Sequence, residues 1–230
     1  MSHSHQRLAD LAYKEICTSG ALLTDDHFVY SSGRHGDTYI VHHEIYTNPE
    51  RIHRLMAMLA QLIVLENPNL SIDTVMGPES GGILMSQGLA FSLGRSLQKT
   101  VHSVWGKKES GEFVKNFSLH ASFEKYVINK SILLVDDFMT SGETFRILIA
   151  LCKKYNGGVL GCSCLWNRGE VTPDQLYGVP IVSLIKQKLE DWDAITECPL
   201  CKKWLPVNTK FGHGKEFDEK QRRRLKMLAC

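Results

Sequence analysis

The sequence has few of the features that mark membrane, secreted or nucleic-acid-binding proteins. No apolar run is long enough to cross a bilayer, and residues 1–7 lack the apolar stretch of a signal peptide. The 27 Lys and Arg nearly balance the 25 Asp and Glu, so the net charge of +2 does not indicate a nucleic-acid partner. The seven cysteines are odd in number and irregularly spaced, which argues against a disulfide framework and for the cytoplasm. We therefore expect neither a nucleic-acid nor a membrane partner.

The 230 residues suit one domain with small attachments, and we expect a main domain over 1–190 and a C-terminal extension over 191–230. Short β-branched runs alternate with longer amphipathic runs, which predicts an α/β fold with a mostly parallel central sheet flanked by helices. Helices are expected at 7–17, 49–66 and 83–93, with another ending at Lys154. Strands are expected at 72–76, 101–105, 132–135, 159–165 and 179–185.

The strongest chemical signal lies between Ile132 and Thr144. An apolar strand is followed at once by Asp136 and Asp137, and then by hydroxyl residues and a glycine at a helix start. Open α/β sheets bind ligands at the carboxyl ends of their strands, and exposed N–H groups at a helix start favour a phosphate. Neighbouring strand residues point to opposite faces, so we expect the two acids to lie in a turn just past the strand.

A simpler interpretation of this segment is a strand-to-helix turn in which Asp and Thr act only as caps. Two tandem acids followed by Thr-Ser-Gly are more than a cap requires. A Walker A loop is excluded, because the chain contains no Gly-Lys-Ser/Thr. The segment therefore favours a site for a sugar phosphate.

Residues 134–144 resemble the 5-phosphoribosyl-1-pyrophosphate (PRPP) motif of type I phosphoribosyltransferases, which implies that fold. The resemblance implies that Asp136 and Asp137 bind the ribose hydroxyls and hold Mg²⁺ together with the substrate. It also implies that the following residues cradle the 5-phosphate; these are Thr140, Ser141, Gly142, Glu143 and Thr144.

Other segments, in matching order from about 7 to 185, resemble the orotate phosphoribosyltransferase branch. The pyrophosphate loop implied by the resemblance is Gly77, Pro78, Glu79, Ser80, Gly81 and Gly82. Lys107 and Lys108 match the start of the catalytic loop. The implied base-binding residues are Phe28, Tyr30, Ser31 and Arg168. Residues 1–45 are expected to supply a hood and base pocket, with the C-terminal segment adding to the hood.

The reaction implied is transfer of phosphoribosyl from PRPP to a nitrogen of orotate, giving orotidine 5-monophosphate and pyrophosphate, in a homodimer. Two alternatives stay open. Ser31 stands where the family has Lys, which allows another acceptor base. The expected mobile loop at 106–116 is short and Asn167 replaces an acid, which allows a catalytically weak PRPP-binding regulatory protein.

Several of these residues also have ordinary structural interpretations. Lys107 and Lys108 could be a solvated loop tip, Arg168 a surface residue at a strand end, and the segment near Tyr30 a Gly-containing turn. Cys198 and Cys201 form half of a zinc site, which His213, Cys17 or Cys230 could complete. Reduced thiols without metal are the expectation for this pair.

Overall fold

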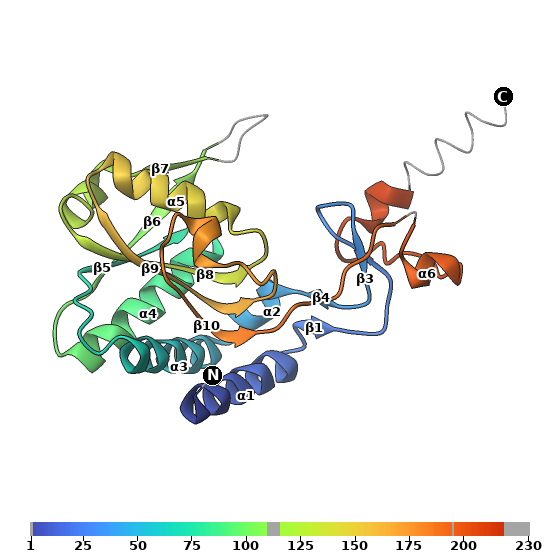
Figure 1. Ribbon diagram of the computed structural model, residues 1–230, viewed down its shortest axis with the longest axis horizontal. Helices are drawn as coiled ribbons and strands as arrows, with labels where there is room; N and C mark the ends of the chain where they lie inside the picture. The colour runs from blue at the N-terminus through green and yellow to red at the C-terminus, as the bar shows by residue number, and fades with distance from the viewer. Residues whose placement is uncertain (1, 110–115, 195, 219–230) are drawn as a thin grey trace. The chain divides into compact units, whose positions relative to one another are not determined.

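The computed structural model describes residues 2–109, 116–194 and 196–218. The chain divides into two compact units, each built from two separate segments (Figure 1). The first unit contains Met1–Glu15 and Asn48–Lys188, and the second contains Ile16–Thr47 and Leu189–Cys230.

The first unit is built on a six-stranded sheet in the order β10-β9-β8-β5-β6-β7. Its strands are β5 (Thr74–Pro78), β6 (His102–Lys108), β7 (Phe117–Leu119), β8 (Ser131–Met139), β9 (Gly158–Asn167) and β10 (Ile181–Lys186). All neighbouring pairs are parallel except β6 and β7. The α/β class with a mostly parallel sheet is therefore confirmed.

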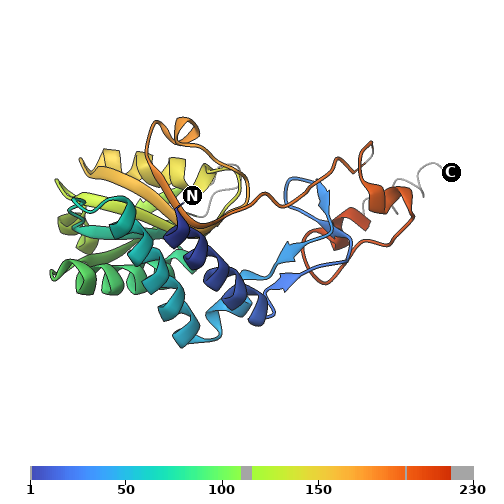
Figure 2. The same cartoon turned by 60° about the horizontal axis from the view of Figure 1, so that its bottom comes forward.

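Helices cover both faces of this sheet (Figures 1 and 2). The helices of the unit are α1 (His3–Thr18, as far as Glu15), α3 (Pro49–Glu66), α4 (Gly81–Leu97) and α5 (Glu143–Lys154), with short 3-10 turns η1 (Ala121–Tyr126) and η2 (Pro173–Leu176). Ile132 and Leu134 belong to the same core cluster as Phe145 and Leu148 of α5. The alternate residues of β8 are also buried, because a central parallel strand is covered on both faces.

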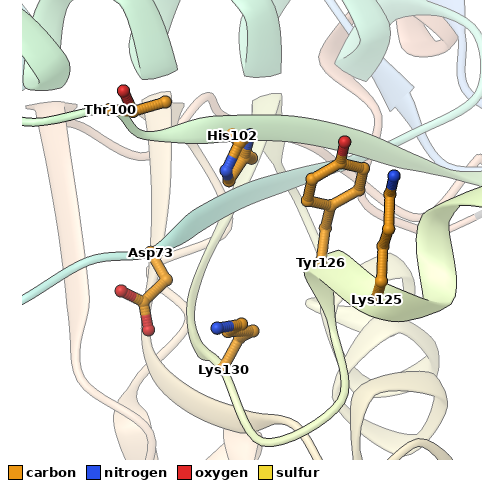
Figure 3. A pocket seen from close by; sticks show the side chains of 6 residues that line it. All are labelled: Asp73, Thr100, His102, Lys125, Tyr126 and Lys130. Carbon is orange, nitrogen blue, oxygen red and sulfur yellow. The ribbon is translucent and has the colours of Figure 1, made fainter.

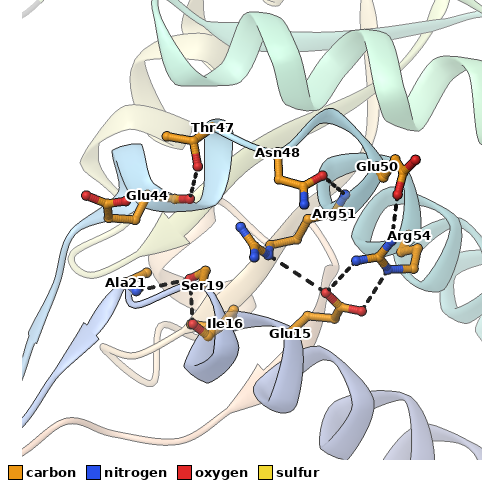
Figure 4. A network of polar contacts seen from close by, with 10 residues as sticks. All are labelled: Glu15, Ile16, Ser19, Ala21, Glu44, Thr47, Asn48, Glu50, Arg51 and Arg54. Carbon is orange, nitrogen blue, oxygen red and sulfur yellow. Dashed lines mark hydrogen bonds and ion pairs between the residues drawn. The ribbon is translucent and has the colours of Figure 1, made fainter.

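The start of α3 follows from its sequence. The Asn48 side chain accepts a hydrogen bond from the Arg51 amide at 3.2 Å, and Pro49 fits the first helical position. Glu15 of α1 receives two hydrogen bonds from Arg54 of α3, at 2.7 and 3.0 Å (Figure 4). The Arg54 guanidinium lowers the pKa of Glu15, so this pair joins α1 to α3.

The path of the chain reverses between β5 and β8, which are neighbours in the sheet. From β5 the chain passes through α4 to β6 on one side, whereas from β8 it passes through α5 to β9 on the other. Such a reversal separates the loops that follow the two strands. In open α/β sheets, ligands bind at such a reversal point.

Two strands differ from the expectation. β6 continues to Lys108 and pairs with β7, so the first residues of the expected mobile loop are sheet, while 110–115 lie outside the described residues. β8 continues to Met139, so Asp136 and Asp137 lie within the strand and not in a turn beyond it. In both cases backbone pairing with a neighbouring strand extends the element past its apolar run.

The second unit combines a segment near the start of the chain with the C-terminal segment. It contains the strand pairs β1 (Leu22–Leu23) with β4 (Tyr39–Ile40) and β2 (Phe28–Val29) with β3 (His35–Gly36), together with α2 (His42–Tyr46) and α6 (Pro199–Lys202). His35 and Trp192 exchange two backbone hydrogen bonds, at 2.7 and 2.8 Å. Arg34 forms an ion pair with Asp191 at 3.0 Å. Among the described residues, every helix is too short or too polar to traverse a lipid bilayer.

A cavity of about 300 Å³ lies at the amino ends of β5, β6 and β8 (Figure 3). Its lining residues are Asp73, Thr100, His102, Lys125, Tyr126 and Lys130. The Asp73 carboxylate accepts a hydrogen bond from the Ser131 amide at 3.0 Å and forms an ion pair with Lys99 at 3.4 Å. These contacts lower the pKa of Asp73, and they join the starts of two adjacent strands.

We expect Asp73→Asn to lower stability in a pH-dependent way. Because the folded pKa is lowered, the carboxylate contributes stability above its unfolded pKa of about 3.9, and this is lost as the pH falls through the folded value. Urea unfolding at pH 7 should show a loss of about 1 kcal/mol, kept small by partial exposure. The difference from wild type should shrink toward pH 3. Equal losses at both pH values would contradict this role, and Asp10→Asn on exposed α1 is the control.

Candidate functional site

The turn from β8 into α5 presents main-chain groups at the carboxyl end of the sheet. Gly142 is the N-cap of α5 and has a φ of 72°. Because it is glycine, it has no side chain that could accept a hydrogen bond from the first helical amides. A Cβ at this position would lie only 3.0 Å from Leu176 and 3.1 Å from Val171. Both the backbone conformation and the packing therefore require glycine, and the exposed start of α5 can accept an anion.

Asp136 and Asp137 lie just before this turn and are both half-buried. The Asp136 carboxylate accepts the amide of Asp137 at 3.0 Å, and the Asp137 carboxylate accepts the amide of Phe138 at 2.7 Å. Each carboxylate is thus oriented by the next residue of the chain.

A second turn with little side-chain bulk follows β5, the neighbour of β8. Gly77 and Gly82 face each other so closely that a Cβ on either would collide with the opposing segment. Ser80 precedes α4 and its side chain makes no cap hydrogen bond, while its carbonyl accepts the Ile83 amide at 3.2 Å. The two helix starts that follow β5 and β8 therefore belong to adjacent strands at the reversal point.

Glu79 connects this turn to β6. Its amide donates to the Gly106 carbonyl at 2.9 Å, and its carboxylate accepts the Lys108 amide at 2.8 Å. Lys107 and Lys108 are exposed residues of β6 paired with Ser118 and Phe117 of β7. The interpretation of these lysines as a loop tip is wrong, because the strand holds their backbone beside the turn after β5.

Residues after β9 support the turn between β8 and α5. The Arg168 Nε donates a hydrogen bond to the Thr140 hydroxyl at 2.9 Å. The amides of Arg168 and Gly169 both donate to the Met139 carbonyl. Gly169 lies so close to Thr140 that a Cβ would collide with the Thr140 carbonyl. Gly169 was not predicted as a site residue; the only signal for it was its place directly after Arg168.

Asn167 has a structural role in the same region. Its buried side chain donates to the Val171 carbonyl at 2.8 Å and accepts the Val171 amide at 3.0 Å. Only an amide can make this reciprocal pair, because a carboxylate has no donor. The departure from the acid expected at this position therefore shapes the loop after β9.

The expected base-binding residues of the N-terminal segment belong to the second unit. Phe28 is buried and its ring stacks on Tyr39 with 5.4 Å between centroids. The Tyr30 hydroxyl donates to the Thr38 carbonyl at 2.5 Å, and Ser31 is exposed. Their contact with a base stays a prediction.

The second unit also brings together His27, His35, Cys198 and Cys201, whose potential ligand atoms all lie within 4.8 Å of one another. Burial lowers the pKa of His35 to about 4. Burial, and to a smaller extent the hydrogen bond with Cys198, raises the pKa of the Cys201 thiol to about 11. Of the partners considered for the two cysteines, Cys17 is exposed, His213 pairs with Glu216, and Cys230 lies outside the described residues. His27 and His35 were not among the partners predicted for the two cysteines.

Comparison with known proteins gives consistent relatives. Residues 42–199 match the phosphoribosyl transferase domain family. Orotate phosphoribosyltransferase of Desulforamulus reducens is 30% identical over 193 residues, covering 84% of this chain and 92% of that protein. The enzyme of the same name from Caldanaerobacter subterraneus subsp. tengcongensis is 29% identical over 195 residues, with the same two coverages.

Solved structures agree on the fold. The orotate phosphoribosyltransferase of Aeropyrum pernix has a TM-score of 0.58 at 21% identity, covering 78% of this chain and 93% of that one. The Mycobacterium tuberculosis H37Rv orotate phosphoribosyltransferase has a TM-score of 0.56 at 16% identity, covering 80% and 96%. At these identities the likeness supports the fold alone.

We expect Gly169→Ala to destabilise the protein by about 1–3 kcal/mol, because the added methyl group forces Thr140 away from the loop after β9. Urea denaturation measures the loss. Gly161→Ala in β9 is the matched control, because a Cβ there has its nearest contacts at an ordinary 3.5 Å. Equal stability of the two variants would show that the close approach of Gly169 to Thr140 is not required.

Proposed function

The chain belongs to the phosphoribosyltransferase family, and we propose that it transfers phosphoribosyl from PRPP to a ring nitrogen of orotate, releasing pyrophosphate. The observation that carries the proposal is the pairing of two turns on adjacent strands. The turn after β8 carries the acid pair and the Gly142-capped helix start, and the turn after β5 carries close-packed glycines. The names of the two bacterial relatives support orotate as the acceptor.

Transfer at C1 of PRPP needs no nucleophile from the protein, because the base nitrogen displaces pyrophosphate. The chain must instead hold both substrates in line and stabilise charge on the leaving oxygens. The turn from Gly77 to Gly82 suits the leaving group, since main-chain amides can approach it closely where no Cβ intervenes. Lys107 and Lys108 add positive charge beside that turn.

The turn from Thr140 to Thr144 suits the 5-phosphate for a related reason. Its amides and the positive end of the α5 dipole both favour an anion. The hydrogen bonds from Arg168 and Gly169 hold this turn in place. Binding of the phosphate therefore need not order the chain. Asp136 and Asp137 lie in β8 directly before this turn, and we propose that the ribose hydroxyls donate hydrogen bonds to them.

The acid pair also fits Mg²⁺, which we propose as the cofactor. Two carboxylates at a half-buried strand end offer the oxygen ligands this ion prefers, and PRPP supplies others. Bound with PRPP, Mg²⁺ would neutralise charge on the departing pyrophosphate. Asp136 and Asp137 would hold the ion together with PRPP, near the ribose.

Arg168 is the residue we propose for the orotate carboxylate. Its Nε bond to Thr140 fixes the plane of the guanidinium at the end of β9. A planar guanidinium with a fixed direction can recognise a carboxylate through two parallel hydrogen bonds. We also propose that the protein is a homodimer, which the family resemblance supports. A cytoplasmic location is supported by the six free cysteines among the described residues.

The acceptor is tested by incubating the full-length protein with PRPP, Mg²⁺ and one base at a time, and following pyrophosphate release. We expect release with orotate and not with uracil, adenine, guanine or hypoxanthine, because only orotate carries the carboxylate that Arg168 can bind. Release with a different base would replace orotate as the acceptor. PRPP binding without release from any base would favour the regulatory alternative.

The PRPP site is tested by the double variant Asp136→Asn with Asp137→Asn. We expect titration calorimetry to show at least a hundredfold loss of PRPP affinity, because two ligands for the ribose hydroxyls and the metal lose their charge. Asp10→Asn, on an exposed face of α1, is the matched control and should bind as wild type does. Unchanged affinity in a folded double variant would refute the site.

A further inference from the structure

Four side chains in the second unit meet at one point. His27 directly precedes β2 and His35 is the first residue of β3, while Cys198 and Cys201 lie at the start of α6. More than 160 residues separate the two pairs along the chain. Their convergence is a property of the folded unit that neither segment shows alone.

Three distances within this His2Cys2 cluster match the edges of a metal tetrahedron. Bonds of about 2.3 Å to sulfur and about 2.0–2.1 Å to nitrogen separate tetrahedral ligands by about 3.3–3.8 Å. The Cys201 sulfur lies 3.3 Å from His35 Nδ1 and 3.7 Å from His27 Nε2, and the Cys198 sulfur lies 3.6 Å from His27 Nε2. The two ring nitrogens are closer, at 2.7 Å, and all four ligand atoms lie within 4.8 Å of one another.

Contacts outside the cluster prepare the ligand atoms. The His27 Nδ1 lies 2.8 Å from the Leu205 carbonyl, so it carries the proton and directs the Nε2 lone pair into the cluster. The Cys201 amide donates to the Cys198 sulfur at 3.4 Å, which holds the two residues of the pair in a fixed arrangement. Both contacts are of the kind that orients metal ligands in closed sites.

The cluster is an unusual filling for a protein core. His27, His35 and Cys198 are each at most 2% exposed. Cysteines that merely fill a core, as Cys162 and Cys164 do, need no imidazoles beside them. Buried polar groups cost free energy unless they are paired, and a cation shared by all four would pair them.

We propose that His27, His35, Cys198 and Cys201 bind one structural Zn²⁺. Two thiolates and two imidazoles in a tetrahedral arrangement select zinc over Mg²⁺ or Ca²⁺, which prefer oxygen. Four protein ligands close the coordination shell, so the ion has no open position for a substrate.

The ion stabilises a unit with a small core. Each of its four strands has two residues, and two-stranded pairs of this size are marginal without further support. Zinc joins the β2–β3 hairpin to the C-terminal segment, adding to the backbone bonds between His27 and Asn208 and between His35 and Trp192. Metal binding therefore becomes folding free energy for the second unit.

Metal analysis of the purified full-length protein tests the site directly. We expect about one Zn²⁺ per chain in wild type and loss of most of it in Cys198→Ser and Cys201→Ser. Cys17→Ser, which removes an exposed thiol outside the cluster, is the matched control and should keep its zinc. Wild-type protein that is folded and free of metal, or a disulfide between Cys198 and Cys201 found by mass spectrometry, would overturn the proposal.

A second measurement avoids variants that fail to fold. Wild-type protein stripped of metal and titrated with Co²⁺ should develop the visible and thiolate charge-transfer bands of a tetrahedral site, saturating at about one equivalent. His35→Asn should weaken these bands, while His213→Asn should leave them unchanged. Absence of the bands in wild type would end the idea. The outcome is independent of phosphoribosyl transfer, because neither readout uses PRPP or a base.

Discussion

The proposed chemistry depends on the parallel pairing of β5 with β8, in which Thr74, Val75 and Met76 face Ile132, Leu133 and Leu134. This pairing sets two helix starts beside each other at the point where the connections diverge. A polyanion with phosphates at both ends of a sugar needs two anion sites at a fixed spacing. Adjacent strands of one sheet hold that spacing without any contribution from long side chains.

Main-chain geometry accounts for the glycines more fully than side-chain chemistry does. Gly142 is required by its backbone conformation and its packing, and Gly77 and Gly169 by the close approach of another segment. None of these positions contributes a functional group, yet each shapes a turn that presents amides. Replacing such a residue changes the site through the backbone, so its effect should appear in stability as well as in ligand binding.

The parallel core was predictable because its signal is local. The run Ile132 to Val135 is apolar without alternation, and Asn48-Pro49 marks the start of a helix, so both could be placed from their own residues. The ends of β6 and β8 could not, because they depend on pairing with strands elsewhere in the chain. The same limit applies to His27 and His35, whose distance from Cys198 along the sequence hides a contact that only the fold creates.

One departure from the family pattern, Asn167, directly precedes Arg168, the residue proposed to bind the acceptor. Asn167 makes a reciprocal hydrogen-bond pair with Val171 that an acid could not make, so it maintains the loop carrying Arg168 by a different contact. The acid pair and the turns from adjacent strands keep the groups that would hold PRPP. In the proposed reaction, selection of the base can therefore vary through the loop after β9 while the sheet preserves the sites for the two phosphate-bearing ends.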